Sequence, residues 1–431
     1  MKFRVIIASL CVVCAVTNWG TAAASAASTT SSGIHLFAGL QGNSGATQAD
    51  AVAAARMSDV VSGLAVQLHK FGSAMRQANP GVALYVYVNG ELAQSKDCST
   101  FPASWYLYSK SGAKVKSGTN GNCAMYPLST QGWNGYKGWI DYVQHQCADG
   151  LRTAPLANGC FVDQISSALN SGFATALPVD PATRALYRAS TWMGQMGQIG
   201  QRIQSFTGKS VVGNSYEGGA RYWGVPTNIV NGYGISGFES EHFLNANQTQ
   251  WTQLAYWMQN VNMMIDGQAH GKGDEVGFTD APATNEEIWR QYVVASYLLG
   301  NNGHAWMAFS SASKHTYTDP SALYKLPIGS PSQTASSVSG YQIRPGVFLR
   351  RFTRGVAIVN LSGSSTTVSL GGTYRDVGGK TYSSITLASA RGIVLSRSSG
   401  GRPGRPMGCS CKAIMPEFSH LFAQHARVRS R

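Results

Sequence analysis

Hydrophobic and polar positions follow two alternating periods along most of the chain. Short apolar runs bounded by Gly, Asn or Pro predict buried strands, whereas apolar residues three and four apart predict helices. The predicted strands are 34–40, 59–63, 82–88, a run ending at Asp163, 210–213, a run ending near Glu241, 275–278 and 304–309. The predicted helices between them are 47–57, 66–78, 136–147, 181–206, 249–263 and 285–299.

This alternation of strand and helix predicts an α/β fold, specifically a (β/α)8 TIM barrel. The rival architecture is an open doubly wound sheet. The first predicted strand is followed by no Gly-rich phosphate loop, which disfavours a dinucleotide-binding sheet. After about Ser330 the sequence pattern changes: residues 344–395 alternate apolar and polar positions between Gly-rich turns. We therefore expect a barrel over 33–330 and a small antiparallel β domain over 340–397.

The two ends of the chain do not fit this pattern. Lys2 and Arg4 precede an apolar run, and Ala24-Ser25-Ala26 matches the small-x-small cleavage pattern, so residues 1–26 are predicted to be a signal peptide. Residues 398–431 are rich in Gly, Pro and Arg, which predicts a disordered tail. We expect a secreted or periplasmic protein.

Composition and charge narrow the class of partner. Only 13% of residues are charged, and the formal net charge is +14. Without the predicted signal and tail, the chain has 26 basic and 19 acidic residues, and the basic residues are scattered rather than clustered. This disfavours nucleic acid as a partner. Outside the signal no apolar run is long enough to cross a bilayer, so we expect no membrane span. The pattern carries no prediction of oligomeric state.

Four cysteines lie between the signal and the tail: Cys98, Cys123, Cys147 and Cys160. Export and an even count favour disulfides, for which three connectivities are possible. We expect the nearest-neighbour pairs, Cys98–Cys123 and Cys147–Cys160. A zinc site is the alternative, but no Cys-x-x-Cys or close His pair supports it, and we expect neither metal nor cofactor.

Carboxylates at strand ends are the strongest functional signal. Asp163 closes the run Gly159–Asp163 (GCFVD), and Glu239 and Glu241 close a later apolar run. In a parallel barrel the carboxyl ends of the strands open onto the active-site face. Side chains two apart on a strand share a face, so Glu239 and Glu241 are both expected at the barrel mouth. Two such acids can divide acid and base work at a glycosidic bond.

The order of these motifs resembles that of the hypothetical glycosyl hydrolase family 15, a family of glycosidase-like TIM-barrel proteins. The resemblance is carried by GCFVD at 159–163, GFESEHF at 237–243, NPGVALYVY at 79–87 and RFTRGVAIVN at 351–360, and it covers about 33–397. It implies a (β/α)8 barrel with carboxylate catalysis on carbohydrate. By position it implies that Asp163 and Glu241 are the functional acids, with Glu239 as a departure from the pattern.

We therefore expect a secreted glycoside hydrolase that cleaves a poly- or oligosaccharide, with Glu241 as acid/base and Asp163 as its partner. The alternatives are a non-catalytic carbohydrate-binding or cell-envelope protein on a barrel scaffold, and a metal-dependent deacetylase, for which no His/Asp cluster is visible. Aromatic rings can stack on sugars and strand-end polar groups can hold hydroxyls. The candidate substrate-binding residues are Tyr85, Tyr87, Asn214, Trp105, Trp133, Trp223 and Asp280.

Overall fold

Eight parallel strands form the central sheet of the computed structural model, in the order β1-β2-β3-β7-β9-β10-β11-β12. The structure describes residues 33–42, 45–118, 120–166, 174–216, 218–224, 234–241, 243–244, 252–281, 285–311 and 321–398. The expected signal peptide, and the expected tail beyond Ser398, lie outside these residues. The strands are β1 Phe37–Gly39, β2 Val60–Gly63, β3 Ala83–Asn89, β7 Gly159–Asp163, β9 Ser210–Tyr216, β10 Gly237–Ser240, β11 Gly273–Ala281 and β12 Ala305–Ser311.

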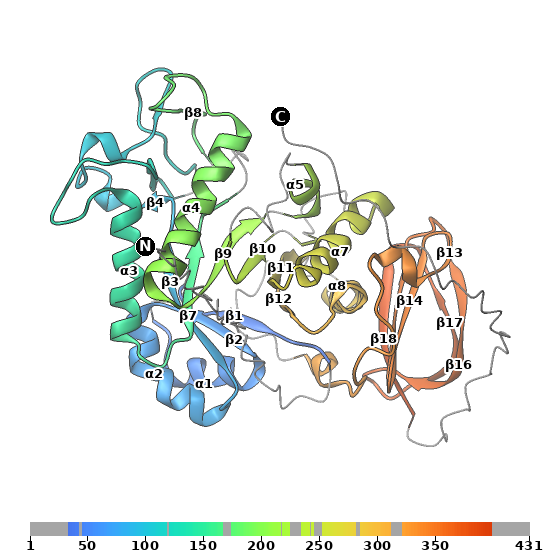
Figure 1. Cartoon of the computed structure of the whole chain (residues 1–431). Helices are drawn as coiled ribbons and strands as arrows, with labels where there is room; N and C mark the ends of the chain where they lie inside the picture. The colour runs from blue at the N-terminus through green and yellow to red at the C-terminus, as the bar shows by residue number, and fades with distance from the viewer. Residues whose placement is uncertain are drawn as a thin grey trace, which may run out of the picture.

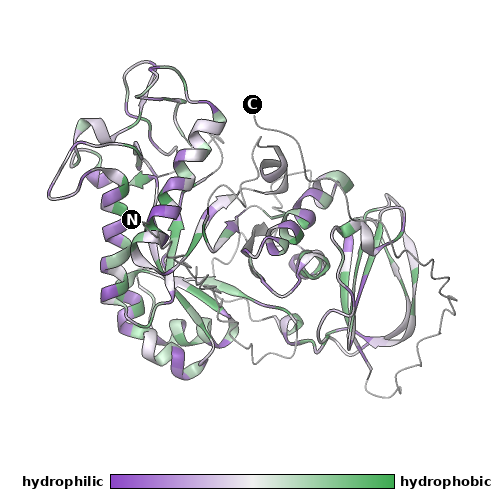
Figure 2. Cartoon of the chain, in the orientation of Figure 1, coloured by the Kyte–Doolittle hydropathy of each residue, from purple (hydrophilic) through white to green (hydrophobic). Residues whose placement is uncertain are grey.

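The sheet closes on itself. Leu36 and Met307 form a parallel bridge, and the Met307 backbone N–H donates to the His35 carbonyl at 3.0 Å. The predicted (β/α)8 barrel is confirmed (Figure 1). The helices are α1 Gln48–Met57, α2 Ala65–Ala78, α3 Trp139–Thr153, α4 Ala189–Thr207, α5 Gly219–Gly224, α7 Leu254–Ala269 and α8 Glu286–Gly300. Figure 2 shows hydrophobic residues along the central strands and mixed colouring on outer helices such as α2 and α3, as expected for amphipathic helices packed on a barrel.

Three helices differ clearly from the predictions. Helix α7 ends at Ala269 rather than at 263. Helix α3 runs past Cys147 to Thr153, because Gly150 serves close packing rather than a helix stop. A Cβ at Gly150 would lie 2.6 Å from Val86 Cγ1 on β3. Helix α4 begins at Ala189 rather than at 181. The preceding residues form a turn in which the Asp180 carboxylate accepts from the Ala182 backbone N–H at 3.0 Å.

Two long excursions leave the C-terminal ends of β3 and β7 and pair with each other. The first contains β4 Leu92–Ala93, β5 Tyr108–Ser109 and β6 Cys123–Ala124, with 3-10 turns at Ser95–Asp97 and Ala103–Trp105; the second contains β8 Pro178–Val179. Strand β5 pairs with β8, so the excursions form one layer above this side of the barrel (Figure 1). This layer therefore stands at the C-terminal ends of β3 and β7.

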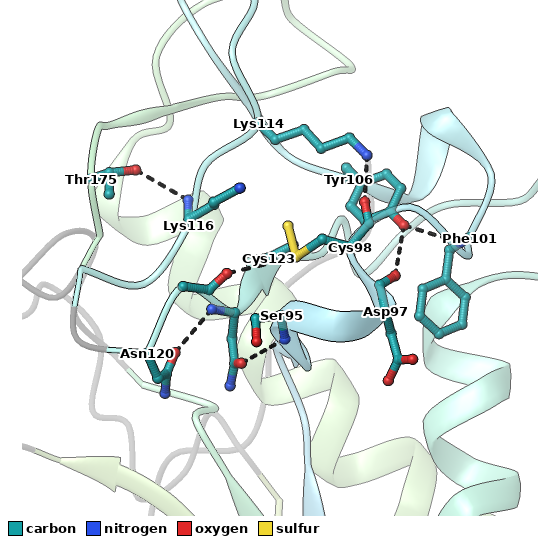
Figure 3. Close-up of a disulfide and its surroundings, with 12 residues drawn as sticks. Ser95, Asp97, Cys98, Phe101, Tyr106, Lys114, Lys116, Asn120, Cys123 and Thr175 are labelled. Carbon is teal, nitrogen blue, oxygen red and sulfur yellow. Dashed lines mark hydrogen bonds between the residues drawn. A yellow bond between two sulfur atoms is a disulfide. The ribbon is translucent and has the colours of Figure 1, made fainter.

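Both predicted disulfides are confirmed. Cys98 pairs with Cys123 inside the first excursion, and Cys147 on α3 pairs with Cys160 on β7. Figure 3 shows the first bond beside a link to the second excursion, in which the Lys116 backbone N–H donates to Thr175 Oγ1 at 3.2 Å. The second bond holds α3 against the strand that ends at Asp163.

Opening either disulfide is expected to lower the free energy of unfolding by about 3 kcal/mol, because the unfolded chain regains the entropy of the closed loop. The sequence separations are 25 residues for Cys98–Cys123 and 13 for Cys147–Cys160. Denaturant unfolding of the Cys147→Ser/Cys160→Ser variant against wild type measures the effect, with Cys98→Ser/Cys123→Ser as the matched pair. Alkylation of these four cysteines in unfolded, unreduced protein would contradict the pairing.

The C-terminal domain is a six-stranded antiparallel sheet in the order β13-β14-β15-β18-β16-β17, which agrees with the expected β domain. Its strands are β13 Gln342–Arg344, β14 Val347–Phe352, β15 Gly355–Asn360, β16 Thr366–Arg375, β17 Thr381–Leu387 and β18 Arg391–Arg397; 3-10 turns at Ala322–Lys325 and Val338–Tyr341 precede it.

A buried arginine joins this sheet to the barrel. Arg350 is fully buried and donates to the carbonyls of Leu298 (2.8 Å) and Asn301 (2.6 Å) and to Asn302 Oδ1 (2.7 Å). These carbonyls end α8, where a cation is favourable. The β domain therefore packs on α8, away from the two excursions (Figure 1). No helix in the described part of the chain is long and apolar enough to cross a membrane.

Candidate active site

The predicted acids meet at the C-terminal face of the barrel. Asp163 is the last residue of β7, and Glu241 directly follows β10. Strand β9 lies between these two strands in the sheet and carries Asn214. Because all three strands run parallel, their carboxyl ends lie at one edge, and Asn214 is placed between the two acids.

Packing on α7 decides which way the β10 side chains point. Phe238 and Ser240 are buried, with Ser240 Oγ 3.7 Å from Met263 Sδ on α7. A Cβ at Gly267 of α7 would lie 2.6 Å from the Phe238 ring. These residues therefore face the helix layer, and strand alternation directs Glu239 and Glu241 toward the barrel interior. Both are half-buried there.

One amide bridges the two carboxylates. Asn214 Nδ2 donates to Asp163 Oδ1 at 2.9 Å and to Glu241 Oε2 at 3.1 Å. The two acceptor oxygens therefore lie no further apart than these contacts laid end to end, about 6 Å. An amide NH₂ group has two hydrogens, so it can serve both acceptors at once.

Asp163 is held by further donors. The Tyr87 hydroxyl donates to Oδ2 at 2.5 Å, and the Gln164 backbone N–H donates to Oδ1 at 2.8 Å. Gln164 has φ +59°, a left-handed conformation that is uncommon for a residue other than glycine. This turn aims the backbone N–H at the carboxylate, and strain of this kind is concentrated at functional sites.

The electrostatics of the pair follow from burial. Burial raises the pKa of Asp163 above its usual value, and the charge of Glu241 raises it further, whereas hydrogen bonds from Tyr87, Asn214 and Gln164 act in the opposite direction. Burial and the charge of Asp163 raise the pKa of the Tyr87 hydroxyl far above its usual range, so Tyr87 keeps its proton and remains a donor. The arrangement supplies two acids of unequal environment in one place, as acid/base chemistry requires.

The other predicted site residues differ in their burial and in their position relative to the two acids. Tyr85 lies two residues before Tyr87 on the same face of β3, deeper in the barrel. Trp223 is 47% exposed on α5, which follows β9 at the same face, and its Nε1 donates to the Gln259 carbonyl at 3.0 Å. Its ring also contacts the Tyr222 ring edge-on, with the centroids 4.7 Å apart. Asp280 lies near the end of β11, but its side chain falls outside the described residues.

The tryptophans of the first excursion form a small core. Trp105 is 0% exposed and stacks on Phe101, while the half-buried Trp133 packs edge-on against the same ring. Trp139 and Tyr142 complete this cluster from α3. In this arrangement the Trp105 ring is occupied by protein on all sides, because a long excursion needs apolar packing of its own.

One carboxyl at this face was missed from the sequence. Glu91 follows β3 after Asn89-Gly90 and is only 9% exposed. Burial and the charge of Asp163 raise its pKa to about 8. A usable signal was present, since Glu91, like Asp163 and Glu241, is an acid at the end of a predicted strand. Within the described residues, no three His, Cys, Asp or Glu side chains gather as a metal site would require.

Fold and site together define a (β/α)8 barrel protein with carboxylates gathered at the C-terminal face. No family model and no curated protein matches the sequence. Among solved structures, the chain is similar to a noncanonic maltogenic alpha-amylase from Thermotoga neapolitana, with 8% identity over 85% of this chain and 99% of that one, and a TM-score of 0.48. It is also similar to a cyclic alpha-maltosyl-(1→6)-maltose hydrolase from Arthrobacter globiformis (10% identity, 79% and 86% covered, TM-score 0.37). An alpha-N-acetylgalactosaminidase from Bifidobacterium bifidum is a third (10% identity, 76% and 56% covered, TM-score 0.37).

Proposed function

We propose that this protein is a secreted glycoside hydrolase that cleaves a poly- or oligosaccharide with retention of anomeric configuration. The observation that carries the proposal is the Asn214 bridge, which sets Asp163 and Glu241 within about 6 Å of each other at the barrel mouth. Retaining glycosidases hold their two carboxyl groups about 5–5.5 Å apart, whereas inverting ones need about 6.5–9.5 Å to admit a water. The resemblance to the hypothetical glycosyl hydrolase family 15 supports the same class.

The hydrogen bonds favour Asp163 as nucleophile. Its carboxylate accepts from Tyr87, Gln164 and Asn214, donors that stabilise the ionised form against the burial that raises its pKa. Glu241 receives its hydrogen bond from Asn214 on Oε2, which leaves Oε1 to approach a leaving-group oxygen. We therefore assign Glu241 as the acid/base.

The reaction then has two steps. Asp163 attacks the anomeric carbon, the bond from that carbon to the glycosidic oxygen breaks, and Glu241 gives its proton to that oxygen. In the second step Glu241, now a carboxylate, takes a proton from water. The resulting oxygen attacks the anomeric carbon and releases Asp163. Each displacement inverts the centre, so the product keeps the configuration of the substrate.

Retention is directly measurable. Hydrolysis of α- and β-linked aryl glycosides and oligosaccharides, followed by proton NMR from the first seconds, is expected to show the substrate's own anomer first, with mutarotation later. The opposite anomer appearing first would mean that a water stands between the carboxyl groups and would overturn the nucleophile assignment. Binding of oligosaccharides without cleavage of any would favour the non-catalytic carbohydrate-binding alternative.

A further inference from the structure

Glu91 lies close enough to Asp163 to sense its charge, and it has no role in the two steps above. Its backbone is fixed relative to β7 from two sides. The Gly90 N–H donates to the Asp163 carbonyl at 2.7 Å, which extends the β3–β7 ladder by one residue, and the Met125 N–H donates to the Glu91 carbonyl at 3.0 Å. The position of Glu91 is therefore set by the same strand pair that positions Asp163.

The residue before it must be glycine. A Cβ at Gly90 would lie 2.4 Å from Ile165 Cγ2 and 2.9 Å from Val162 Cγ1, so a larger residue would push the ends of β3 and β7 apart. The Trp139 indole N–H closes the junction by donating to the Gly90 carbonyl at 2.7 Å. The tripeptide Asn89-Gly90-Glu91 thus brings a third acid against the candidate site.

The Glu91 carboxyl is nearly buried, but its oxygens still reach solvent, since the fully buried side-chain oxygens without a partner in the described part of the chain are those of Ser396 and Ser398. Among the described residues, none donates a hydrogen bond or lends a positive charge to it. The titratable groups that face it are Asp163 from β7 and Tyr187 from the segment before α4, and Tyr187 in turn lies near Asp180 and Tyr126. All of these are acids or phenols, so none of these described groups offsets a negative charge on Glu91. A carboxyl that is nearly buried and receives no donor from the described residues can take a hydrogen bond from a group that enters from the solvent side.

An arriving substrate can supply the missing partner. We propose that Glu91 is a substrate-binding residue whose carboxyl hydrogen-bonds a hydroxyl group of the sugar unit seated against Asp163; this assignment rests on the proposed glycosidase function. A protonated carboxyl both donates and accepts, as a sugar hydroxyl does, so the two groups can form a reciprocal pair. An ionised carboxyl loses its donor and repels Asp163. The raised pKa of about 8 keeps Glu91 protonated at neutral pH.

The experiment compares Glu91→Gln, which keeps a neutral donor and acceptor of the same shape, with Glu91→Leu, which keeps only the volume. Asp180→Asn is the matched control, because Asp180 is also buried (4% exposed, against 9% for Glu91) but its carboxylate is engaged in its own turn. KM and kcat are measured from pH 5 to pH 10 on an activated aryl glycoside that wild type cleaves, so that the proton of Glu241 is not limiting. Thermal unfolding of each variant reports folding.

We expect KM to rise at least about 10-fold in Glu91→Leu, which is the loss of roughly one hydrogen bond, and to change little in Glu91→Gln and Asp180→Asn. Wild-type kcat/KM should fall above about pH 8. Glu91→Gln, which cannot ionise, should remain flat across that range.

Wild-type KM in folded Glu91→Leu, or an alkaline fall that persists in Glu91→Gln, would overturn the assignment. So would loss of kcat at unchanged KM in Glu91→Gln, which would make Glu91 a proton donor. If Glu91→Leu does not fold, the pH profile of Glu91→Gln decides alone. If wild type cleaves glycosides but the Glu91 variants behave like wild type, only this inference is overturned. If wild type cleaves no glycoside, the proposed function is overturned, and the role of Glu91 with it.

Discussion

Replacing Asp163 with Asn is expected to lower kcat for glycoside hydrolysis by at least about 10⁴-fold, the scale seen when a catalytic nucleophile is removed. An amide cannot attack the anomeric carbon to form the covalent intermediate. The measurement is the steady-state rate on the best aryl glycoside found in the anomer experiment. Because this substitution changes one atom, the loss would be chemical rather than structural.

The Asp163→Asn variant should still fold, because the new amide can replace the hydrogen bonds that the Asp163 carboxylate makes. Oδ1 of the new amide can still accept from Asn214 Nδ2 and from the Gln164 N–H. The amide NH₂ would replace Oδ2 opposite Tyr87, whose hydroxyl can rotate to accept. The raised pKa of Asp163 means that folded protein holds this proton longer than unfolded chain, so wild type loses stability as pH rises through that window. Asp163→Asn cannot ionise at this position, so its stability does not fall in that pH window. At neutral pH the variant should be at least as stable as wild type.

Two further variants test whether Asp163 is the nucleophile. Asp163→Gly in the presence of azide should recover turnover and yield a glycosyl azide of inverted configuration, because azide attacks from the vacated side. Tyr87→Phe removes a donor to Asp163, so the pKa of Asp163 should rise and the acidic limb of the pH–rate profile should move to higher pH. Wild-type turnover by Asp163→Asn would show that Asp163 is not the nucleophile.

Most of the fold was accessible from the sequence pattern alone, because the barrel strands are short apolar runs bounded by Gly, Asn or Pro and separated by helical periodicity. The errors lie where a residue serves packing rather than its usual local role. Gly150 stands inside α3 because β3 passes close to it, although glycine normally signals a helix end. The pattern before α4 looked helical, but Asp180 organises a turn there. The contact of Gly150 with β3 exists only in the folded chain, whereas the Asp180 turn is local and Asp180-Pro181 was a usable turn signal.

The site was predictable where a strand end carries an acid, and less so where the partner depends on the sheet order. Asp163 and Glu241 follow from the strand-end rule, but their bridge through Asn214 requires β9 to lie between β7 and β10. Trp105 was expected at the substrate because it lies in a loop, yet it packs in the core of the first excursion. Glu91 was accessible by the same strand-end rule but was missed, because the turn Asn89-Gly90 separates it from the apolar run; its burial, and hence its raised pKa, follows only from the fold.

Variants of Glu241 and Glu239 should differ in how strongly their hydrolysis rates depend on the leaving group of the substrate. Glu241→Gln is expected to lower kcat on unactivated oligosaccharides by about 10²–10⁴-fold, the usual contribution of a general acid. An activated aryl glycoside needs little protonation, so its cleavage step should be spared, and a burst of released phenol should precede a slow second step. Glu239→Gln should leave both substrates nearly unchanged and only shift the alkaline limb.

The structure distinguishes the two acids by the neighbours that sense their charges. Glu241 is bonded to the same Asn214 amide as Asp163, and its charge raises the pKa of Asp163, whereas the charge of Glu239 is felt at Tyr87. The group that shares the nucleophile's hydrogen bond is the one placed to exchange protons at the anomeric centre. Wild-type cleavage of an unactivated oligosaccharide by Glu241→Gln, together with its loss in Glu239→Gln, would reverse the assignment. If neither substitution changes the rate, carboxylate catalysis at this face is wrong, and the Asn214 bridge has a structural purpose only.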